Sequence, residues 1–168
     1  MGNKTIGLAL AFLVISCVSA FAGGEQDSAT NKTVLYSVGT YNGRPCYWQN
    51  AVRRNLAIPF GAKGGEAGGI TVGADGAVYI PGYYVNGNDN SIPCYWQNGE
   101  RKDLPIPNGA DGHAGGIAIG ANGTVYISGG YADRNGNIIP CYWQDDIRYN
   151  IGVLENGEDI VSQFIVIR

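Results

Sequence analysis

The chain has 168 residues, a length that suits one domain, and its formal net charge at pH 7 is −3. Lys and Arg are few and scattered, so the composition excludes the basic surface that a nucleic-acid partner requires. The 27 glycines recur at regular positions, which indicates turns between strands rather than a disordered chain.

The N-terminus, Met1–Ala22, is similar to a secretory signal sequence, because an apolar stretch is followed by the small-x-small pattern of Ala20-Phe21-Ala22. Residues 23–31 are polar and are predicted to be a flexible leader. We therefore expect an exported protein, located in the periplasm, the outer envelope or the surroundings of a bacterial cell. Val14–Cys17 is similar to a lipobox, so the alternative is a lipid on Cys17, which would be the only route to a membrane.

The strongest pattern in the chain is the pentapeptide Pro-Cys-Tyr-Trp-Gln, which occurs at Pro45–Gln49, Pro93–Gln97 and Pro140–Gln144. The copies lie about 47 residues apart, and a fixed period of this size is typical of repeat architectures. The stretches Gly68–Gly99 and Gly115–Asp146 also match at more than half of their positions without a gap. We predict repeats at about 33–67, 68–114 and 115–161, and a closing strand at 162–168.

Each full repeat predicts four short strands, because apolar, β-branched and aromatic runs alternate with turn residues. In the second repeat these strands are Ile70–Gly73, Ala77–Tyr84, Ser91–Gln97 and Arg101–Ile106. Tight turns are predicted at Asp75-Gly76 and Asn98-Gly99, and a longer loop at Asn86–Asn90. Four antiparallel strands in about 47 residues is the size of a propeller blade.

The segments Asp75–Tyr83 and Asn122–Gly130 resemble the D-G-x-[IV]-Y-[VI]-x-G-Y core of bacterial secreted β-propeller repeat proteins, which are similar in plan to kelch and NHL blades. The resemblance covers nearly all of residues 33–168 and implies an all-β, propeller-like fold of about three four-stranded blades. The first repeat lacks its first strand and the chain end, Gln163–Ile167, supplies one, so we expect the C-terminal strand to complete the first blade.

Three blades are fewer than the four to eight of most propellers. Three arrangements follow from this shortfall: two chains that join head to tail into a six-bladed ring, an open three-blade wedge, or a piece of a longer repeat protein. Self-association is the hypothesis that we favour, because open blade faces would otherwise expose apolar surface.

Residues at equivalent repeat positions are expected to form the structural core. Three cysteines at equivalent sites predict small buried hydrophobes rather than disulfides, and a shared three-thiol metal site is the alternative. The Trp and Tyr side chains of the pentapeptide are expected to pack between blades, with stacking on sugars as the alternative. The predicted core residues are Cys46, Trp48, Cys94, Trp96, Cys141, Trp143, Tyr36, Tyr79 and Tyr126.

The long polar loops, among them Gly61–Ala67 and Asn108–Ala114, are predicted to share one rim of the blades, where a rigid scaffold would hold binding residues. The Asn86–Asn90 and Asp133–Asn137 loops have alternating oxygen ligands, but they lack the glycine and glutamate of a calcium loop, so an Asn-rich turn is preferred to a calcium site. The candidate ligand-binding residues are Lys63, Glu66, Asn88, Asp89, Asp111, His113, Asp133, Arg134 and Asn135.

The sequence contains no catalytic motif, so we expect a binding module without cofactor or metal, whose ligand is a glycan or a protein held at the rim. A structural or adhesive surface scaffold is the alternative. A glycan-active enzyme is a third hypothesis, and it would require a pair of carboxylates such as Asp111 and Asp133.

Overall fold

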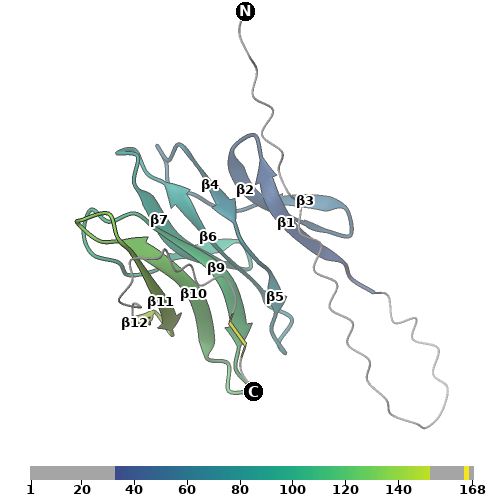
Figure 1. Ribbon diagram of the computed structural model, residues 1–168. Coiled ribbons are helices and arrows are strands. Elements are labelled where there is room, and N and C mark those ends of the chain that lie inside the picture. Colours follow the sequence, from purple (N-terminus) through teal and green to yellow (C-terminus); the bar gives the residue numbers. More distant parts are fainter. Residues whose placement is uncertain (1–32, 152–164, 167–168) are drawn as a thin grey trace, which may run out of the picture.

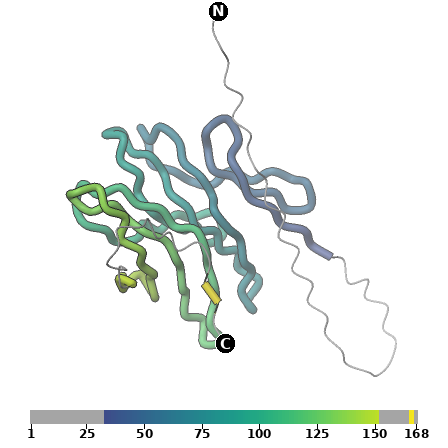
Figure 2. Tube along the Cα trace, viewed as in Figure 1, coloured from purple at the N-terminus to yellow at the C-terminus, as the bar shows by residue number. Residues whose placement is uncertain are grey.

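The computed structural model describes residues 33–151 and 165–166, and in these ranges all regular elements are strands. Figure 1 shows that they form three antiparallel sheets that stand next to one another in chain order. The chain completes each sheet before it begins the next (Figure 2). No helix in these ranges is long and apolar enough to cross a membrane.

The strands fall into sheets of the order that a repeat predicts. Sheet 1 is β1-β2-β3, with β1 at Tyr36–Tyr41, β2 at Arg44–Gln49 and β3 at Val52–Asn55. Sheet 2 is β4-β6-β7-β8, with β4 at Gly64–Ala67, β6 at Val78–Val85, β7 at Ser91–Gln97 and β8 at Glu100–Asp103; the short β5, Thr71–Val72, also pairs with β6. Sheet 3 is β9-β10-β11-β12, with β9 at Gly112–Ile119, β10 at Val125–Ala132, β11 at Ile138–Gln144 and β12 at Ile147–Asn150.

The all-β prediction is confirmed, and the described strands form three sheets. The sheets do not show a closed ring. Sheet 1 has three strands among the described residues, and Ile165 and Val166, which belong to the predicted closing strand, are not part of any strand. The rest of that segment, the predicted signal sequence and the polar leader lie outside the described residues.

The turn after each pentapeptide has the same construction in all three sheets. Asn98 and Gly99 have φ angles of 53° and 88°, as a two-residue hairpin turn requires. The Asn98 Oδ1 accepts the Val78 N–H at 2.9 Å, and Asn50 and Asp145 accept the N–H of the matching residue in sheets 1 and 3. Each turn therefore also fixes the start of the strand beside it.

The first strand of a full repeat begins earlier than predicted. The sequence analysis placed it at Ile70–Gly73 and left Gly61–Ala67 and Asn108–Ala114 as loops, but β4 starts at Gly64 and β9 at Gly112. The stretch Gly64–Ala67 has little strand propensity. It pairs because glycine permits close approach: a Cβ on Gly65 would lie 2.4 Å from the Tyr83 carbonyl oxygen.

The fourth strand ends earlier than predicted. The expected range was Arg101–Ile106, whereas β8 ends at Asp103. Leu104 still donates its N–H to the Pro93 carbonyl at 2.8 Å, but Pro105 has no N–H with which to continue the ladder.

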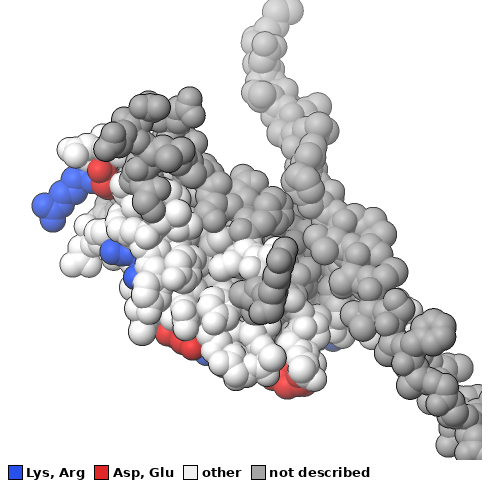
Figure 3. Space-filling model, turned by 60° about the horizontal axis from the view of Figure 1, so that its bottom comes forward, with Lys and Arg blue, Asp and Glu red and all other residues white. Residues whose placement is uncertain are grey.

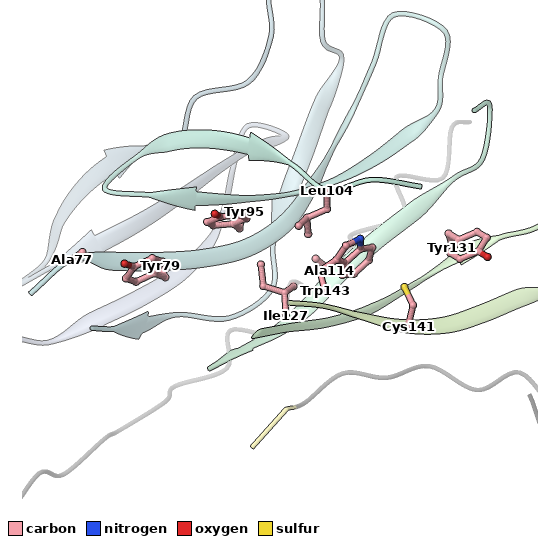
Figure 4. Packing of buried hydrophobic residues seen from close by; sticks show 9 residues of the cluster. All are labelled: Ala77, Tyr79, Tyr95, Leu104, Ala114, Ile127, Tyr131, Cys141 and Trp143. Atoms are coloured by element: carbon pink, nitrogen blue, oxygen red, sulfur yellow. The ribbon is translucent and has the colours of Figure 1, made fainter. Parts of the chain in front are cut away.

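The pentapeptide packs one sheet onto the next. Trp96 and Trp143 are fully buried, and the indole Nε1 of each donates to a carbonyl in the link that follows the preceding sheet, at Ala57 (2.6 Å) and Pro105 (3.0 Å). Figure 4 shows Leu104, from the end of sheet 2, above Trp143 of sheet 3. The prediction that these tryptophans pack between sheets is therefore confirmed.

A glycine faces each of these tryptophan rings. A Cβ on Gly82 would lie 2.9 Å from Trp96 Cζ3, and a Cβ on Gly129 would lie 3.0 Å from Trp143 Cζ3. Gly82 and Gly129 thus leave room for the indole ring, because any side chain at these positions would occupy the space that the ring fills.

Two core clusters result from this packing. The cluster between sheets 1 and 2 is centred on Ile80, Cys94 and Trp96, and that between sheets 2 and 3 on Ile127, Cys141 and Trp143. Sheet 2 contributes to both, whereas sheets 1 and 3 contribute to one each. Other predicted core residues are less enclosed: Tyr79 is buried, and Tyr36, Trp48 and Tyr126 are half-buried.

Candidate functional site

One rim of the sheets carries the longer connections, as the topology predicts. The β6–β7 loop, the β10–β11 loop and the links that enter β4 and β9 gather there, whereas the other rim carries the tight turns. Lys63 and Asp89 form an ion pair across this rim with a separation of 2.5 Å. Both side chains are largely exposed, so the pair contributes little to stability.

The two Asn-rich loops are held by their own side chains. Asn86 Oδ1 accepts the N–H groups of Asn88 and Asn90, and Asp133 Oδ1 accepts those of Asn135 and Asn137. The Asn137 side chain also donates to Asp133 Oδ2 at 3.0 Å. This bond has the largest effect on the pKa of Asp133, and together with the backbone bonds it lowers that pKa. The two loops are therefore turns closed by one side-chain oxygen each, as the preferred interpretation predicted. Arg134 is an exposed residue of the same turn.

One hollow of the rim lies where sheet 2 meets sheet 3. Its volume is about 310 Å³, which is at the lower end of the range for small-molecule sites. Aromatic and aliphatic groups supply part of the wall, and three polar side chains supply the rest. The lining residues are Tyr83, Ser91, Asp111, Gly112, His113, Tyr131, Ala132 and Ile138. We call this hollow the rim pocket.

Asp111 braces the rim pocket. Its Oδ1 accepts the Ser91 N–H at 2.7 Å, which ties the entrance of β9 to the start of β7, and its carbonyl accepts the Ala132 N–H at 2.7 Å. Among the described residues Oδ2 accepts no hydrogen bond, and the residue is exposed. One carboxylate oxygen is therefore held in place while the other is open to a ligand that donates a hydrogen bond.

His113 and Tyr83 are uncharged at neutral pH. Burial lowers the pKa of the half-buried His113, so its ring stays neutral and offers one donor and one acceptor. Burial also raises the pKa of Tyr83, and the nearby Glu66 carboxylate raises it further. Glu66 and His113 occupy the same repeat position, and both lie on strands, β4 and β9, rather than in the loops that the sequence analysis gave them.

The corresponding junction between sheets 1 and 2 has a different construction. Gly64 stands where the repeat alignment places Asp111, and its Cβ position is 2.5 Å from the Gly43 carbonyl oxygen. Gly65 donates its N–H to that same carbonyl at 3.1 Å. The junction between sheets 1 and 2 is therefore a direct contact of two backbones. The junction between sheets 2 and 3, in contrast, is bridged by the Asp111 side chain.

A second hollow, of about 260 Å³, lies beside the rim pocket under residues 104–110. It is lined by Asn86, Asn90 and Ile92 on one side and by the proline-rich link on the other. The bond between Asp111 and the Ser91 N–H lies at the boundary of the two hollows, since Ser91 follows Asn90 and Asp111 follows Ala110.

Sequence reasoning found the rim but not the walls of the pocket. It named Asp111 and His113, and it missed Tyr83, Tyr131, Ser91 and Ile138. Strand alternation could have indicated Tyr83, because it points to the same face as Tyr79 and Tyr95, toward sheet 3. Of the other candidates, Lys63, Glu66, Asn88, Asp89, Asp133, Arg134 and Asn135 do not line the rim pocket.

The cysteines of the described residues are buried, and the charged groups on the face that Figure 3 shows are dispersed. Cys46, Cys94 and Cys141 are free and buried, and burial raises the pKa of all three thiols, that of Cys141 to about 12. In the part of the chain that the structure describes, no group of His, Cys, Asp and Glu is placed to hold a metal ion. Figure 3 shows a largely uncharged face, with separated Lys, Arg, Asp and Glu near its margin.

Comparisons with known proteins give a fold but not a family. No family model matches the chain, and no curated protein sequence matches it. A solved structure of a fucose lectin from Kordia zhangzhouensis, in complex with methyl-fucoside, superposes with a TM-score of 0.54 and 14% identity. The match covers 74% of this chain and 95% of the lectin. At this identity the similarity shows that the two proteins share a fold.

Proposed function

We propose that this protein is an exported carbohydrate-binding module and that the rim pocket is its ligand site. The observation that carries the proposal is the composition of that pocket: aromatic and aliphatic wall on one side, and Ser91, Asp111 and His113 around it. A sugar has apolar C–H faces and hydroxyl groups that both donate and accept hydrogen bonds. Such a ligand needs a wall of this mixed kind, with few and well-placed polar groups.

The polar groups of the rim pocket match sugar hydroxyls in chemistry. The open oxygen of Asp111 accepts a hydroxyl proton, and a charge-assisted hydrogen bond of this kind is stronger than a neutral one. A neutral His113 serves as donor or acceptor, whichever the hydroxyl requires. The pocket volume accommodates a small ligand such as one sugar residue.

The comparison supports the choice of probe. The fold neighbour is a lectin solved with methyl-fucoside, and its name describes a binder rather than an enzyme. The rim pocket has one carboxylate, Asp111, in its lining, and the Asp133 carboxylate is occupied by its own turn. The arrangement thus supports binding over glycoside hydrolysis, which requires two carboxylates across the bond to be cut.

The test is a glycan array, followed by calorimetric titration with methyl-fucoside or with the best array ligand. Asp111→Ala removes the open oxygen and the brace to Ser91, so we expect an affinity loss of about tenfold or more. Glu100→Gln is the matched control, because Glu100 is an exposed carboxylate on β8 beside the opposite rim, and its affinity should equal that of the native protein.

Two outcomes would contradict the proposal. If no glycan binds, the result favours the alternative of a structural or adhesive scaffold. If a glycan binds but Asp111→Ala and Glu100→Gln have equal affinity, the ligand site is elsewhere on the molecule.

A further inference from the structure

The two contacts between neighbouring sheets are built from the same three parts. The first is the indole Nε1 bond, from Trp96 to the link after sheet 1 and from Trp143 to the link after sheet 2. The second is a tyrosine on the same face as the tryptophan, Tyr84 or Tyr131, each 7% exposed. An arginine of the outermost strand covers this ring at 4.8 Å or 4.6 Å from its centroid.

The third part comes from the preceding sheet. Leu56 follows sheet 1 and Leu104 follows sheet 2, and each donates its N–H to the proline of its own pentapeptide. Both leucines belong to the core cluster next to them, with 4% and 2% of their surface exposed. Each contact therefore has a tryptophan-bearing face and a leucine-bearing face.

Sheet 1 has the tryptophan-bearing face, and among residues 33–151 and 165–166 no sheet lies against it. Tyr41 stands at the position of Tyr84 and Tyr131, and the Arg53 guanidinium lies 3.8 Å from its ring centroid, as in the other two sheets. Tyr41 is 49% exposed, in contrast to the 7% of its equivalents. Trp48 is half-buried, whereas Trp96 and Trp143 are fully buried.

Sheet 3 has the leucine-bearing face in the same open condition. Ile151 donates its N–H to Pro140 at 2.8 Å, as Leu56 does to Pro45 and Leu104 does to Pro93. Its side chain is 41% exposed, in contrast to 4% and 2%. The two halves of one interface are thus open at opposite ends of the chain.

We propose that the Tyr41–Trp48 face of one chain binds the Ile151 face of a second copy of the same chain. The occupant is identified by the internal contacts, which show twice that these two faces fit each other. Such a contact is head to tail, and a head-to-tail contact closes into a ring when its rotation permits. Two chains of three sheets would form a six-sheet ring, which is within the range of propellers.

The indole of the motif also contributes to the contact. In the internal contacts it donates to the residue that follows Leu56 or Leu104, so each tryptophan-bearing face is completed by a hydrogen bond to the neighbouring sheet. This proposal does not depend on the proposed function, because the rim pocket lies at a different junction.

The first experiment measures the solution mass by light scattering over a wide concentration range, for the native protein and for two variants. We expect a dimer for the native protein. Ile151→Asp puts a charge into the contact, so its dissociation constant should rise by about tenfold or more. Ile147→Asp is the matched control, because its equivalents Val52 and Glu100 stay exposed in sheets 1 and 2, where the corresponding face is packed against the next sheet, and it should remain as dimeric as the native protein.

The second experiment tests the head-to-tail sense. Trp48→Arg blocks one face and Ile151→Asp blocks the other, so each variant alone should be monomeric. Mixed in equal amounts they retain one intact contact, between the native Trp48 face of one and the native Ile151 face of the other. We expect a one-to-one heterodimer from the mixture.

The proposal is overturned if the native protein is a monomer at every concentration. It is also overturned if Ile147→Asp dissociates the dimer as much as Ile151→Asp, or if the mixture of the two blocked variants stays monomeric. Circular dichroism of each variant confirms that a loss of mass is not a loss of fold.

Discussion

Gly82 offers the sharpest test of how the sheets are held together. In Gly82→Ala the new methyl group would lie 2.1 Å from the Glu66 carbonyl oxygen, 2.9 Å from Trp96 Cζ3 and 3.1 Å from the Ala67 Cα. Two of these atoms belong to the backbone of β4, so the strand must shift. The third belongs to a fully buried ring that is fixed by its 2.6 Å bond to the Ala57 carbonyl.

The size of the effect follows from this geometry. Overpacking of a core typically costs about 1–3 kcal/mol, and contacts this short with atoms that cannot move place Gly82→Ala at the upper end. For a chain of this length, each kcal/mol lowers the melting temperature by about 2–4 °C, so we expect a decrease of about 6–12 °C. Calorimetry or circular dichroism during heating measures it.

Gly87→Ala is the matched control, since it adds the same methyl group where its one neighbour, the Gly61 carbonyl oxygen, is 3.8 Å away. The backbone of Gly87 is not in the left-handed region, so the variant should be neutral or more stable by up to about 1 kcal/mol. Gly39→Ala should be intermediate, because its Cβ would meet only Trp48, at 3.3 Å. A Gly82→Ala protein that melts within about 2 °C of the native one would refute the view that Gly82 is needed to leave room for the indole ring.

Three further predictions concern single side chains. Trp96→Phe removes the indole donor and part of a fully buried ring, so it should lower the free energy of unfolding by about 1–3 kcal/mol in urea titrations, and by more than Trp48→Phe, whose ring is half-buried. Cys94 and Cys141 should resist thiol reagents at pH 8 in the native protein and react after unfolding, as measured by peptide mapping, because burial raises the pKa of both thiols; rapid native labelling would contradict their burial. The pKa of His113 is lowered in the folded state, so the folded state binds fewer protons than the unfolded one, and the free energy of unfolding should fall as the pH drops below about 6.5. His113→Gln should reduce this dependence, and an unchanged pH profile would show that another group is responsible.

The repeat could be predicted from the sequence because its turns and its core depend on short local patterns. Asn98-Gly99 needs two positive φ angles, and few residue pairs other than Asn-Gly supply them readily. Cys94 and Trp96 were expected in the core because both faces of their strand are apolar, and the sheets on either side explain why.

The parts that sequence reasoning missed depend on contacts between distant residues. Gly64–Ala67 was expected to be a loop because glycine disfavours strands, and it pairs only because Tyr83 lies so close to its backbone. The rim pocket depends on the Asp111 brace to Ser91, a bond between residues of different sheets that no local pattern encodes. The topology gave the correct rim, but which side chains turn into the hollow is decided by how sheet 3 stands against sheet 2.

Sheet 2 lies between sheets 1 and 3 and contributes to both core clusters, which determines the order in which the sheets can separate. Sheets 1 and 3 each lose one packed surface when they separate, whereas sheet 2 can be exposed only after a neighbour has left. In a molecule whose units contact their neighbours in sequence, stability behaves as a sum of units and nearest-neighbour terms. Backbone amides of β6 and β7 should therefore exchange their hydrogens with solvent most slowly, and exchange should spread inward from the two terminal sheets.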